Sequence, residues 1–233
     1  MKMISQTKAA VRDVIQRVVP SRIPPIIVAS MGRSGSTLVH NSICQGLGKA
    51  RFGLSNTLTS RLVAGYAWDL SEARLKPGVA YKTHALAHEM PVLPDAKVVF
   101  LFGSAVDAAV SVLSTEALYG TDWVQEHFGH LRAQGKFADL TSRDVLRFTD
   151  QLDGWFGLSG NPIIALHYDA LWDNQDRLSD FLGFEVTLPI RRQRRSKSIA
   201  PAVLDELNVT YADLETRIAA LPGVTVLPGH KHC

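Results

Sequence analysis

The sequence Ser30-Met31-Gly32-Arg33-Ser34-Gly35-Ser36-Thr37 decides the fold of this chain. It follows the apolar run 25–29 and precedes residues 38–43, whose pattern predicts a helix. A buried strand, a turn of small residues and a helix N-terminus together form an anion site, because free backbone N–H groups converge there and the helix dipole favours negative charge. Gly32 and Gly35 let the main chain approach a phosphate or sulfate closely. We therefore expect a phosphorylated or sulfated ligand.

The loop differs from a nucleotide-triphosphate loop. That motif needs Gly, four residues and then Gly-Lys-Ser/Thr, with the lysine reaching the terminal phosphates and the hydroxyl holding magnesium. Here Ser36 precedes Thr37, and the cation is Arg33. Ser34, Ser36 and Thr37 add hydroxyl donors. This arrangement suits a dianionic group held without a metal; the alternative is a Gly/Ser-rich turn without a ligand.

The composition is that of an ordinary globular protein. The chain has 233 residues, of which 46% are apolar and 20% charged, enough for one α/β domain with a sizeable core. The net charge of +3 implies no general field for polyanions, so no nucleic-acid partner is expected. Cys44 and Cys233 show no metal or disulfide spacing, which favours a reducing compartment and a cytoplasmic location. No apolar run reaches the length of a membrane span, and the oligomeric state stays open.

Strand-like and helical patterns alternate along the sequence. Strands are expected at 25–30, 79–83, 97–103 and 162–167, with a weaker one at 224–227, and helices at about 36–47, 105–118, 143–157, 170–182 and 202–220. Two helices begin with capping boxes, Ser104-x-x-Asp107 and Thr141-x-x-Asp144. The alternation predicts one three-layer α/β/α domain over residues 1–233, with a central, mainly parallel sheet. Ligands of such sheets bind beyond the carboxyl ends of the strands.

Residues 1–24 are expected to form a helical extension. Val11, Ile15, Val18 and Val19 fall at helical spacing with basic residues between them, and prolines then end the segment. Packing on the domain itself is the preferred interpretation; a docking helix or a weak membrane-surface contact is the alternative.

Lys82 and His84 follow the second expected strand and point to the same face, because residues two apart on a strand do so. If this strand neighbours the first, both side chains reach the anion loop. A lysine can neutralise the charge on a leaving group, and a neutral histidine can accept a proton near pH 7. A solvated strand end is the alternative for this pair.

Four segments of the chain, in order, resemble the sulfotransferases that use 3′-phosphoadenylyl sulfate (PAPS). The matching segments are Pro25–Ile43, Lys82-Thr83-His84, Val98–Ser111, and Tyr168-Asp169-Ala170-Leu171 with Phe181-Leu182-Gly183. They span about residues 25–184, which leaves a basic segment and a C-terminal helix in 185–233. The resemblance implies a P-loop nucleotide-hydrolase-like sulfotransferase fold and PAPS as co-substrate, without a metal.

The resemblance also implies residue roles. Arg33 with residues 34–37 would bind the 5′-phosphosulfate, and Tyr168 would belong to the donor site. Arg33 and Lys82 would stabilise the charge on the departing phosphate oxygen, and His84 would deprotonate the acceptor; these three are the expected catalytic residues. Ser111 matches the serine that binds the 3′-phosphate; a helix serine bonded to its own preceding turn is the alternative.

One position departs from the family pattern. The family has an arginine eight residues before the serine, where this chain has Gly103. A guanidinium that binds phosphate through two hydrogen bonds is not easily replaced. The basic cluster 191–197, with Arg191, Arg192 and Arg194, is a candidate replacement, and a solvated loop is the alternative.

Other histidines and tryptophans are expected to pack rather than react. His127 and His130 lie on one helical face after Trp123, but two histidines without a third ligand rarely form a metal site. A place in an acceptor pocket is the alternative for them. Trp68, Trp155 and Trp172 are expected in the core or at a rim.

The leading hypothesis is in-line transfer of a sulfuryl group from PAPS to a hydroxyl or amine of a small-molecule or glycan acceptor, with His84 as the general base. The second is a small-molecule kinase, which would need ATP and magnesium. The third is a degenerate relative that binds an anion or nucleotide without turnover. The identity of the acceptor is not encoded in recognisable motifs, because acceptor pockets are built from variable loops.

Overall fold

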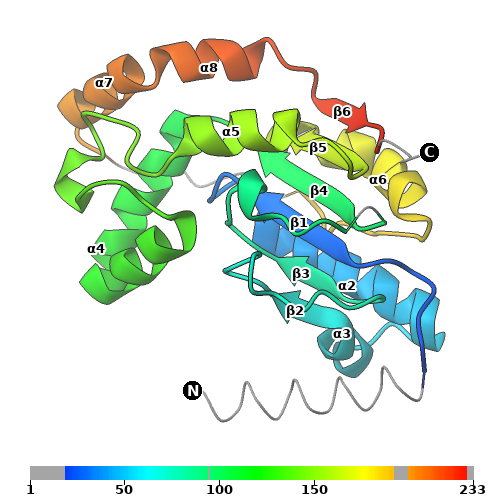
Figure 1. Cartoon of the computed structure of the whole chain (residues 1–233). Coiled ribbons are helices and arrows are strands. Elements are labelled where there is room, and N and C mark those ends of the chain that lie inside the picture. Colours follow the sequence, from blue (N-terminus) through cyan, green and yellow to red (C-terminus); the bar gives the residue numbers. More distant parts are fainter. Residues whose placement is uncertain (1–18, 94, 192–198, 230–233) are drawn as a thin grey trace.

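The structure is a computed structural model, and it describes residues 19–93, 95–191 and 199–229. Figure 1 shows its elements in chain order: β1 (Ile26–Ser30), α2 (Ser36–Phe52), α3 (Thr57–Val63), β2 (Ala64–Tyr66), β3 (Ala80–Lys82), β4 (Lys97–Phe102), α4 (Ala105–Leu131), α5 (Phe148–Gly157), β5 (Ile163–His167), α6 (Gln175–Leu182), α7 (Pro201–Thr210), α8 (Ala212–Ala219) and β6 (Val224–Leu227). Most of the expected N-terminal helix lies outside the described residues, as do Arg192 and Arg194.

The strands of the described residues form one sheet in the order β2-β3-β1-β4-β5-β6. All neighbours pair in parallel except β5 and β6, which are antiparallel. In the centre, Ile27 of β1 pairs with Tyr81 of β3 on one side and Val98 of β4 on the other. The prediction of a three-layer α/β/α fold with a mainly parallel sheet is therefore confirmed.

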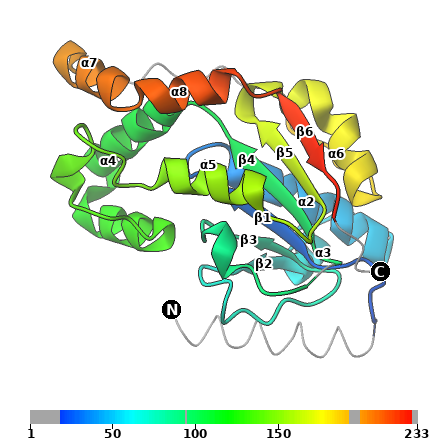
Figure 2. The ribbon, with the colours of Figure 1, turned by 45° about the horizontal axis from the view of Figure 1, so that its top comes forward.

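Two helical layers cover the sheet, and each has its own apolar cluster. The side chains of Ile26 and Val28 face the cluster formed with α2 and α6, whereas Ile27 and Ala29 face the cluster formed with α4, α5, α7 and α8. The alternation follows from the two-residue period of a strand. Figure 2 shows α5 and α8 on one side of the strands and α2 on the other. β4 is buried on both faces from Val98 to Phe102, as its continuous apolar run predicts.

The edge strand β2 was not expected from the sequence. Its three residues, Ala64-Gly65-Tyr66, form no apolar run and contain a glycine. Gly65 is required by packing, because a Cβ there would collide with the ring of Tyr81 on β3. The strand is thus specified by its neighbour rather than by its own sequence.

Several helix boundaries differ from the expected ones. α5 begins at Phe148, not near 143, and the Thr141 capping box is wrong: the carboxylate of Asp144 accepts from the backbone N–H groups of Phe148 and Thr149 instead. The expected helix at 170–182 is α6 preceded by 3₁₀ turns, and the expected helix at 202–220 is split into α7 and α8 at the buried Tyr211.

The helix α4 is longer than expected and contains a break. Its Ser104 cap is as expected, since the hydroxyl accepts from the backbone N–H of Asp107 at 3.0 Å. At Gly120 the backbone leaves the helical region, with φ 77° and ψ −174°, and the helix then resumes to Leu131. Left-handed φ values of this kind favour glycine. Despite its length, neither α4 nor another helix in the described ranges is apolar enough to cross a bilayer.

Gly46 and Gly129 offer a matched test of helix packing. A Cβ at Gly46 in α2 would collide with the backbone carbonyl of Glu185, whereas a Cβ at Gly129 in α4 would meet nothing within 4 Å. We expect Gly46→Ala to lower the free energy of unfolding by roughly 1–3 kcal/mol, since overpacking forces the backbone to move. Gly129→Ala should be neutral or raise it by up to about 1 kcal/mol. Urea unfolding of both variants checks this; equal effects would contradict it.

Candidate functional site

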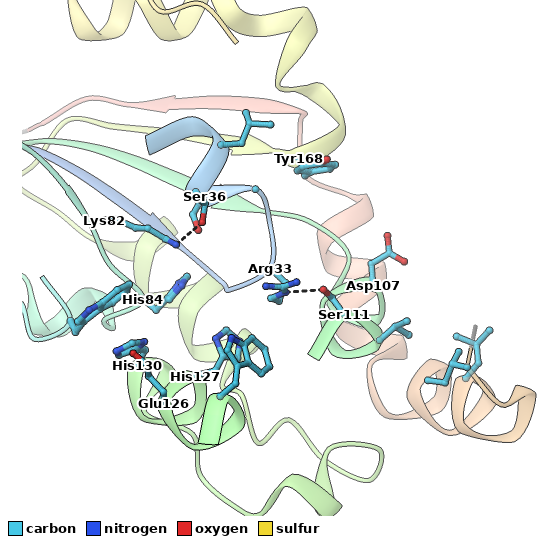
Figure 3. A pocket seen from close by; sticks show the side chains of 18 residues that line it. Arg33, Ser36, Lys82, His84, Asp107, Ser111, Glu126, His127, His130 and Tyr168 are labelled. Atoms are coloured by element: carbon cyan, nitrogen blue, oxygen red, sulfur yellow. Dashed lines mark hydrogen bonds between the residues drawn. The ribbon is translucent and has the colours of Figure 1, made fainter. Parts of the chain in front are cut away.

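The carboxyl ends of β1, β3, β4 and β5 share one edge of the sheet, and a cavity of about 900 Å³ opens there. Figure 3 shows Arg33, Lys82 and His84 reaching it from the sheet side, with His127 and His130 of α4 across from them. Its lining consists of Arg33, Gly35, Ser36, Thr37, Leu38, Trp68, Lys82, His84, Asp107, Val110, Ser111, Trp123, Glu126, His127, His130, Tyr168, Ile199 and Leu204.

The loop after β1 leads directly into the N-terminus of α2. Gly35 is the N-cap with φ 83°, and no side chain caps the first turn. The N–H groups of that turn therefore lack a side-chain acceptor, which is the arrangement that binds anions. Tyr168 requires the glycine, because a Cβ at Gly35 would lie 2.7 Å from its ring. Ser36 and Thr37 line the cavity beside this terminus.

Two predicted loop ligands lie outside the cavity lining. The hydroxyl of Ser34 is buried and donates to the backbone carbonyl of Leu101 at 3.1 Å, which anchors the loop to β4. Gly32, with φ 89°, packs against α4, where a Cβ would lie 3.3 Å from the side chain of Leu131. Both residues shape the loop rather than present a side chain to a ligand.

Arg33 bridges from the loop to α4. Its Nε donates to the Ser111 hydroxyl at 2.8 Å and its Nη2 to the Thr115 hydroxyl at 3.2 Å. Its guanidinium also lies over the ring of Trp123, 5.6 Å from the centroid. The structure thus brings Arg33 and Ser111 together, two residues that the sequence analysis assigned to opposite ends of a donor. Thr115 was missed, although it lies one turn after Ser111 on the same helix face.

Gly103, the departure from the family pattern, lies against Tyr168. A Cβ there would be 3.3 Å from the Cβ of Tyr168, so the absent side chain leaves room for that residue. Arg191 does not line the cavity: it pairs with Asp169 at 3.2 Å and lies over Trp172. Within the described residues, the guanidinium next to Ser111 is that of Arg33.

Lys82 reaches the start of α2 from β3. Its Nζ donates to the Thr37 hydroxyl at 2.8 Å and lies 5.9 Å from the centroid of the Trp68 ring. The pKa of Lys82 is lowered, first by burial and then by the charge of Arg33. Two cations therefore share the region around the α2 terminus, and a bound anion would relieve their repulsion.

His84 is held as a neutral ring. Its Nδ1 lies 3.0 Å from the Ser30 hydroxyl and 3.3 Å from the Ser30 carbonyl. Because a carbonyl only accepts, its contact favours the tautomer with the proton on Nδ1, in which Nε2 keeps its lone pair. The pKa of His84 is lowered to about 3, chiefly by burial and then by the charge of Lys82. The ring is thus a base without charge at neutral pH.

The backbone of His84 is fixed from α5. The side chain of Gln151 donates to the His84 carbonyl at 2.6 Å and accepts from the Trp155 indole at 2.9 Å. Gln151 and Trp155 are fully buried, so this chain of hydrogen bonds is rigid. Trp155 is a core residue as expected. Gln151 was missed, because a single glutamine in a helical pattern gives no signal.

His127 and His130 pack against tryptophans, as expected, and both rings also line the cavity. Trp123 stacks on His127 with centroids 4.8 Å apart, and Trp68 stacks on His130 at 4.0 Å. The i, i+4 spacing of Trp123 and His127 was the available signal. Within the described residues, no three His, Cys, Asp or Glu side chains gather as a metal site would need.

Arg132 ties the end of α4 to the wall that carries Trp68. Its Nη2 donates to the Trp68 carbonyl and to the Glu89 carboxylate, each at 3.0 Å, and lies 3.3 Å from Asp69. The residue ends the helix in the left-handed region, with φ 55°. This contact fixes the spacing between the two tryptophan–histidine stacks.

No family model and no curated protein matches this sequence. Among solved structures, mouse sulfotransferase SULT7A1 complexed with PAP aligns at 10% identity and a TM-score of 0.43, over 94% of this chain and 71% of that one. Retinol dehydratase in a complex with retinol and PAP aligns at 17% identity and a TM-score of 0.44, over 85% of this chain and 68% of that one.

The buried neutral histidines predict an acid-sensitive fold. The pKa values of His84 and His127 lie near 3 in the folded protein and near 6.5 when unfolded, so the unfolded chain binds more protons between these values. The contribution of the two histidines to stability is therefore complete above about pH 6.5. Below that pH, the free energy of unfolding falls by roughly 1.4 kcal/mol for each pH unit and each histidine. Urea unfolding between pH 6.5 and 5 measures this slope. His84→Gln should reduce it, and an unchanged slope would contradict the assignment.

Proposed function

We propose that this protein is a PAPS-dependent sulfotransferase, which transfers a sulfuryl group to a hydroxyl or amine of a small-molecule or glycan acceptor. The observation that carries the proposal is the contact of Lys82 with Thr37 at the start of α2, 2.8 Å long, next to a histidine held neutral.

The lysine–threonine contact separates this site from a triphosphate site. In a triphosphate loop the hydroxyl after the lysine binds magnesium. Here the corresponding hydroxyl of Thr37 accepts from an ammonium group, whose charge disfavours a divalent cation at the same oxygen. The loop has Ser36 where a triphosphate loop has lysine, and the ammonium group of Lys82 lies beside it instead. This arrangement suits a ligand that needs no magnesium. This favours sulfuryl transfer over the kinase hypothesis.

Arg33 takes the place of the arginine that the family pattern has where this chain has Gly103. Its guanidinium lies beside Ser111 and Thr115, where two hydroxyls and a cation form a second polar cluster of the cavity. A planar guanidinium with a hydroxyl is a common phosphate-binding set. The loop arginine would therefore serve the 3′-phosphate of the donor, and Lys82 with the α2 terminus the 5′-phosphosulfate. This replaces the role first assigned to Arg33.

The cavity is large enough for two reactants. Its volume of about 900 Å³ lies near the upper end of the range, roughly 300–1,000 Å³, that is typical of ligand pockets. The groups assigned to phosphate lie on the loop, at Lys82 and on the first half of α4, whereas a second region is formed around Trp68, which stacks on His84 with centroids 5.6 Å apart. We assign the second region to the acceptor.

PAPS would supply an activated sulfuryl group bonded to a phosphate oxygen. His84 would accept the acceptor's proton on Nε2 while the acceptor oxygen bonds to sulfur and the bond from sulfur to the phosphate oxygen breaks. Lys82 would stabilise the electron pair left on that phosphate oxygen. Burial is the main cause of the low pKa of His84, and the charge of Lys82 lowers it further. The negative charge of a bound donor would offset the effect of Lys82, raise the pKa and make the ring a stronger base.

Ligand-dependent stability tests the proposed donor. We expect PAPS and adenosine 3′,5′-bisphosphate to raise the melting temperature without magnesium, because a ligand at 100 times its Kd adds about 2.7 kcal/mol. ATP with magnesium should give a smaller shift. Stabilisation by ATP that depends on magnesium, with none by PAPS, would support the kinase hypothesis instead.

Replacement of His84 tests the proposed base. His84→Asn keeps a group that can donate to Ser30 but has no Nε2. We expect turnover of PAPS to fall roughly 10²–10⁴-fold, with unchanged binding of adenosine 3′,5′-bisphosphate. Release of the bisphosphate, measured with a panel of phenols, sterols, sugars and amines, reports turnover. A fully active variant would remove His84 from the mechanism, and binding without turnover in the wild type would support the degenerate relative.

A further inference from the structure

His127 has a buried nitrogen that the fold does not satisfy. The side chain is only 8% exposed, and its Nε2 has no hydrogen-bond partner in the described part of the chain. Buried polar atoms in native proteins are nearly always paired, so this nitrogen needs a partner from outside the chain, such as a ligand or a water. The proposed sulfuryl transfer has so far assigned nothing to this residue.

The position of His127 relates it to the anion loop. A Cβ at Gly32 would lie 3.8 Å from its Cε1, so the ring lies directly against the loop. Trp123 stacks on the ring, and the Arg33 guanidinium lies over the same indole. The ring of His84 meets His127 edge to face, with centroids 5.9 Å apart. His127 therefore lies between the loop cation and the proposed base.

The charges around His127 indicate the kind of ligand. Its pKa is lowered to about 3, first by burial and then by the charges of Arg33, His130 and Lys82. A neutral imidazole among cations lacks an anionic partner, and a neutral ring always carries one N–H that can donate. An oxyanion bound beside Lys82 and His84 would accept a hydrogen bond from the His127 ring and offset the charge of Lys82.

We propose that His127 donates a hydrogen bond to an oxygen of the transferring sulfuryl group, an inference that rests on the proposed function. The 3′-phosphate is the poorer partner, because Arg33, Ser111 and Thr115 already supply its donors in the proposed arrangement, whereas the ring of His127 meets that of the proposed base His84. The sulfuryl group is the part of the donor that must lie beside the base. His127 thereby distinguishes PAPS from its product, which lacks that group.

The test compares two ligands in the absence of acceptor. Calorimetry gives the Kd of PAPS and of adenosine 3′,5′-bisphosphate for the wild type and for His127→Phe, which keeps a flat ring and removes both nitrogens. We expect the variant to bind PAPS about tenfold more weakly and the bisphosphate unchanged. His127→Gln, which retains an N–H donor, should recover part of the loss. His88→Phe is the control, because His88 is exposed in the turn Ala87–Glu89 and does not line the cavity, and it should leave both Kd values unchanged.

A second measurement uses the unaltered protein. Imidazole nitrogen resonances, with His127 assigned by its loss in His127→Gln, should shift more on addition of PAPS than of the bisphosphate. Equal weakening of both ligands in His127→Phe would overturn the inference in favour of a structural role. Unchanged binding of both with a raised KM for acceptor would overturn it in favour of acceptor binding. If the wild type binds neither ligand, the proposed function itself fails.

Discussion

The parallel pairing of β1 between β3 and β4 is the constraint on which the site depends. It places Val28 beside Lys82 and Ser30 beside Leu101, so that three strands end at one edge of the sheet. The loop at 31–35, the side chains of Lys82 and His84, and the start of α4 then meet without long connections. A shift of one residue in β3 would turn Lys82 and His84 to the other face, because side chains alternate along a strand. The chemistry of the site thus relies on a register fixed by the buried residues of β1.

The charged groups Arg33 and Lys82 make the site positive and favour the binding of an anion. Burial lowers the pKa of Lys82 and of His127 most; the charge of Arg33 lowers both further, and the charge of Lys82 adds to the shift of His127. Such mutual repulsion costs stability in the free protein, and it is removed when a negative group binds. Rigid supports hold the groups in place meanwhile: Trp123 under Arg33 and His127, and Gln151 behind His84. The favourable interaction of the cations with a bound anion therefore acts at the groups whose charge changes during the proposed reaction, the leaving oxygen and the base.

The sequence predicts the sheet better than the walls of the cavity. The apolar runs of β1 and β4 specify buried strands by themselves, and the anion loop follows from the glycines beside β1. β2 could not be predicted, because its position depends on Tyr81 of the neighbouring strand. The contact of Arg33 with Ser111 joins residues 78 positions apart, and no local pattern encodes it. The cavity role of His127 likewise depends on how α4 returns after Gly120, which propensity alone does not give.

The break at Gly120 makes α4 two short helices joined by one residue. The first carries Ser111 and Thr115, and the second carries Trp123 and His127. The distance between the phosphate-binding and aromatic regions is thus governed by a single pair of backbone torsion angles. Nothing lies within 4 Å of the space a side chain would occupy there. A change in the torsion angles at Gly120 would therefore change the width of the cavity. The sheet, the anion loop and His84 would keep their positions.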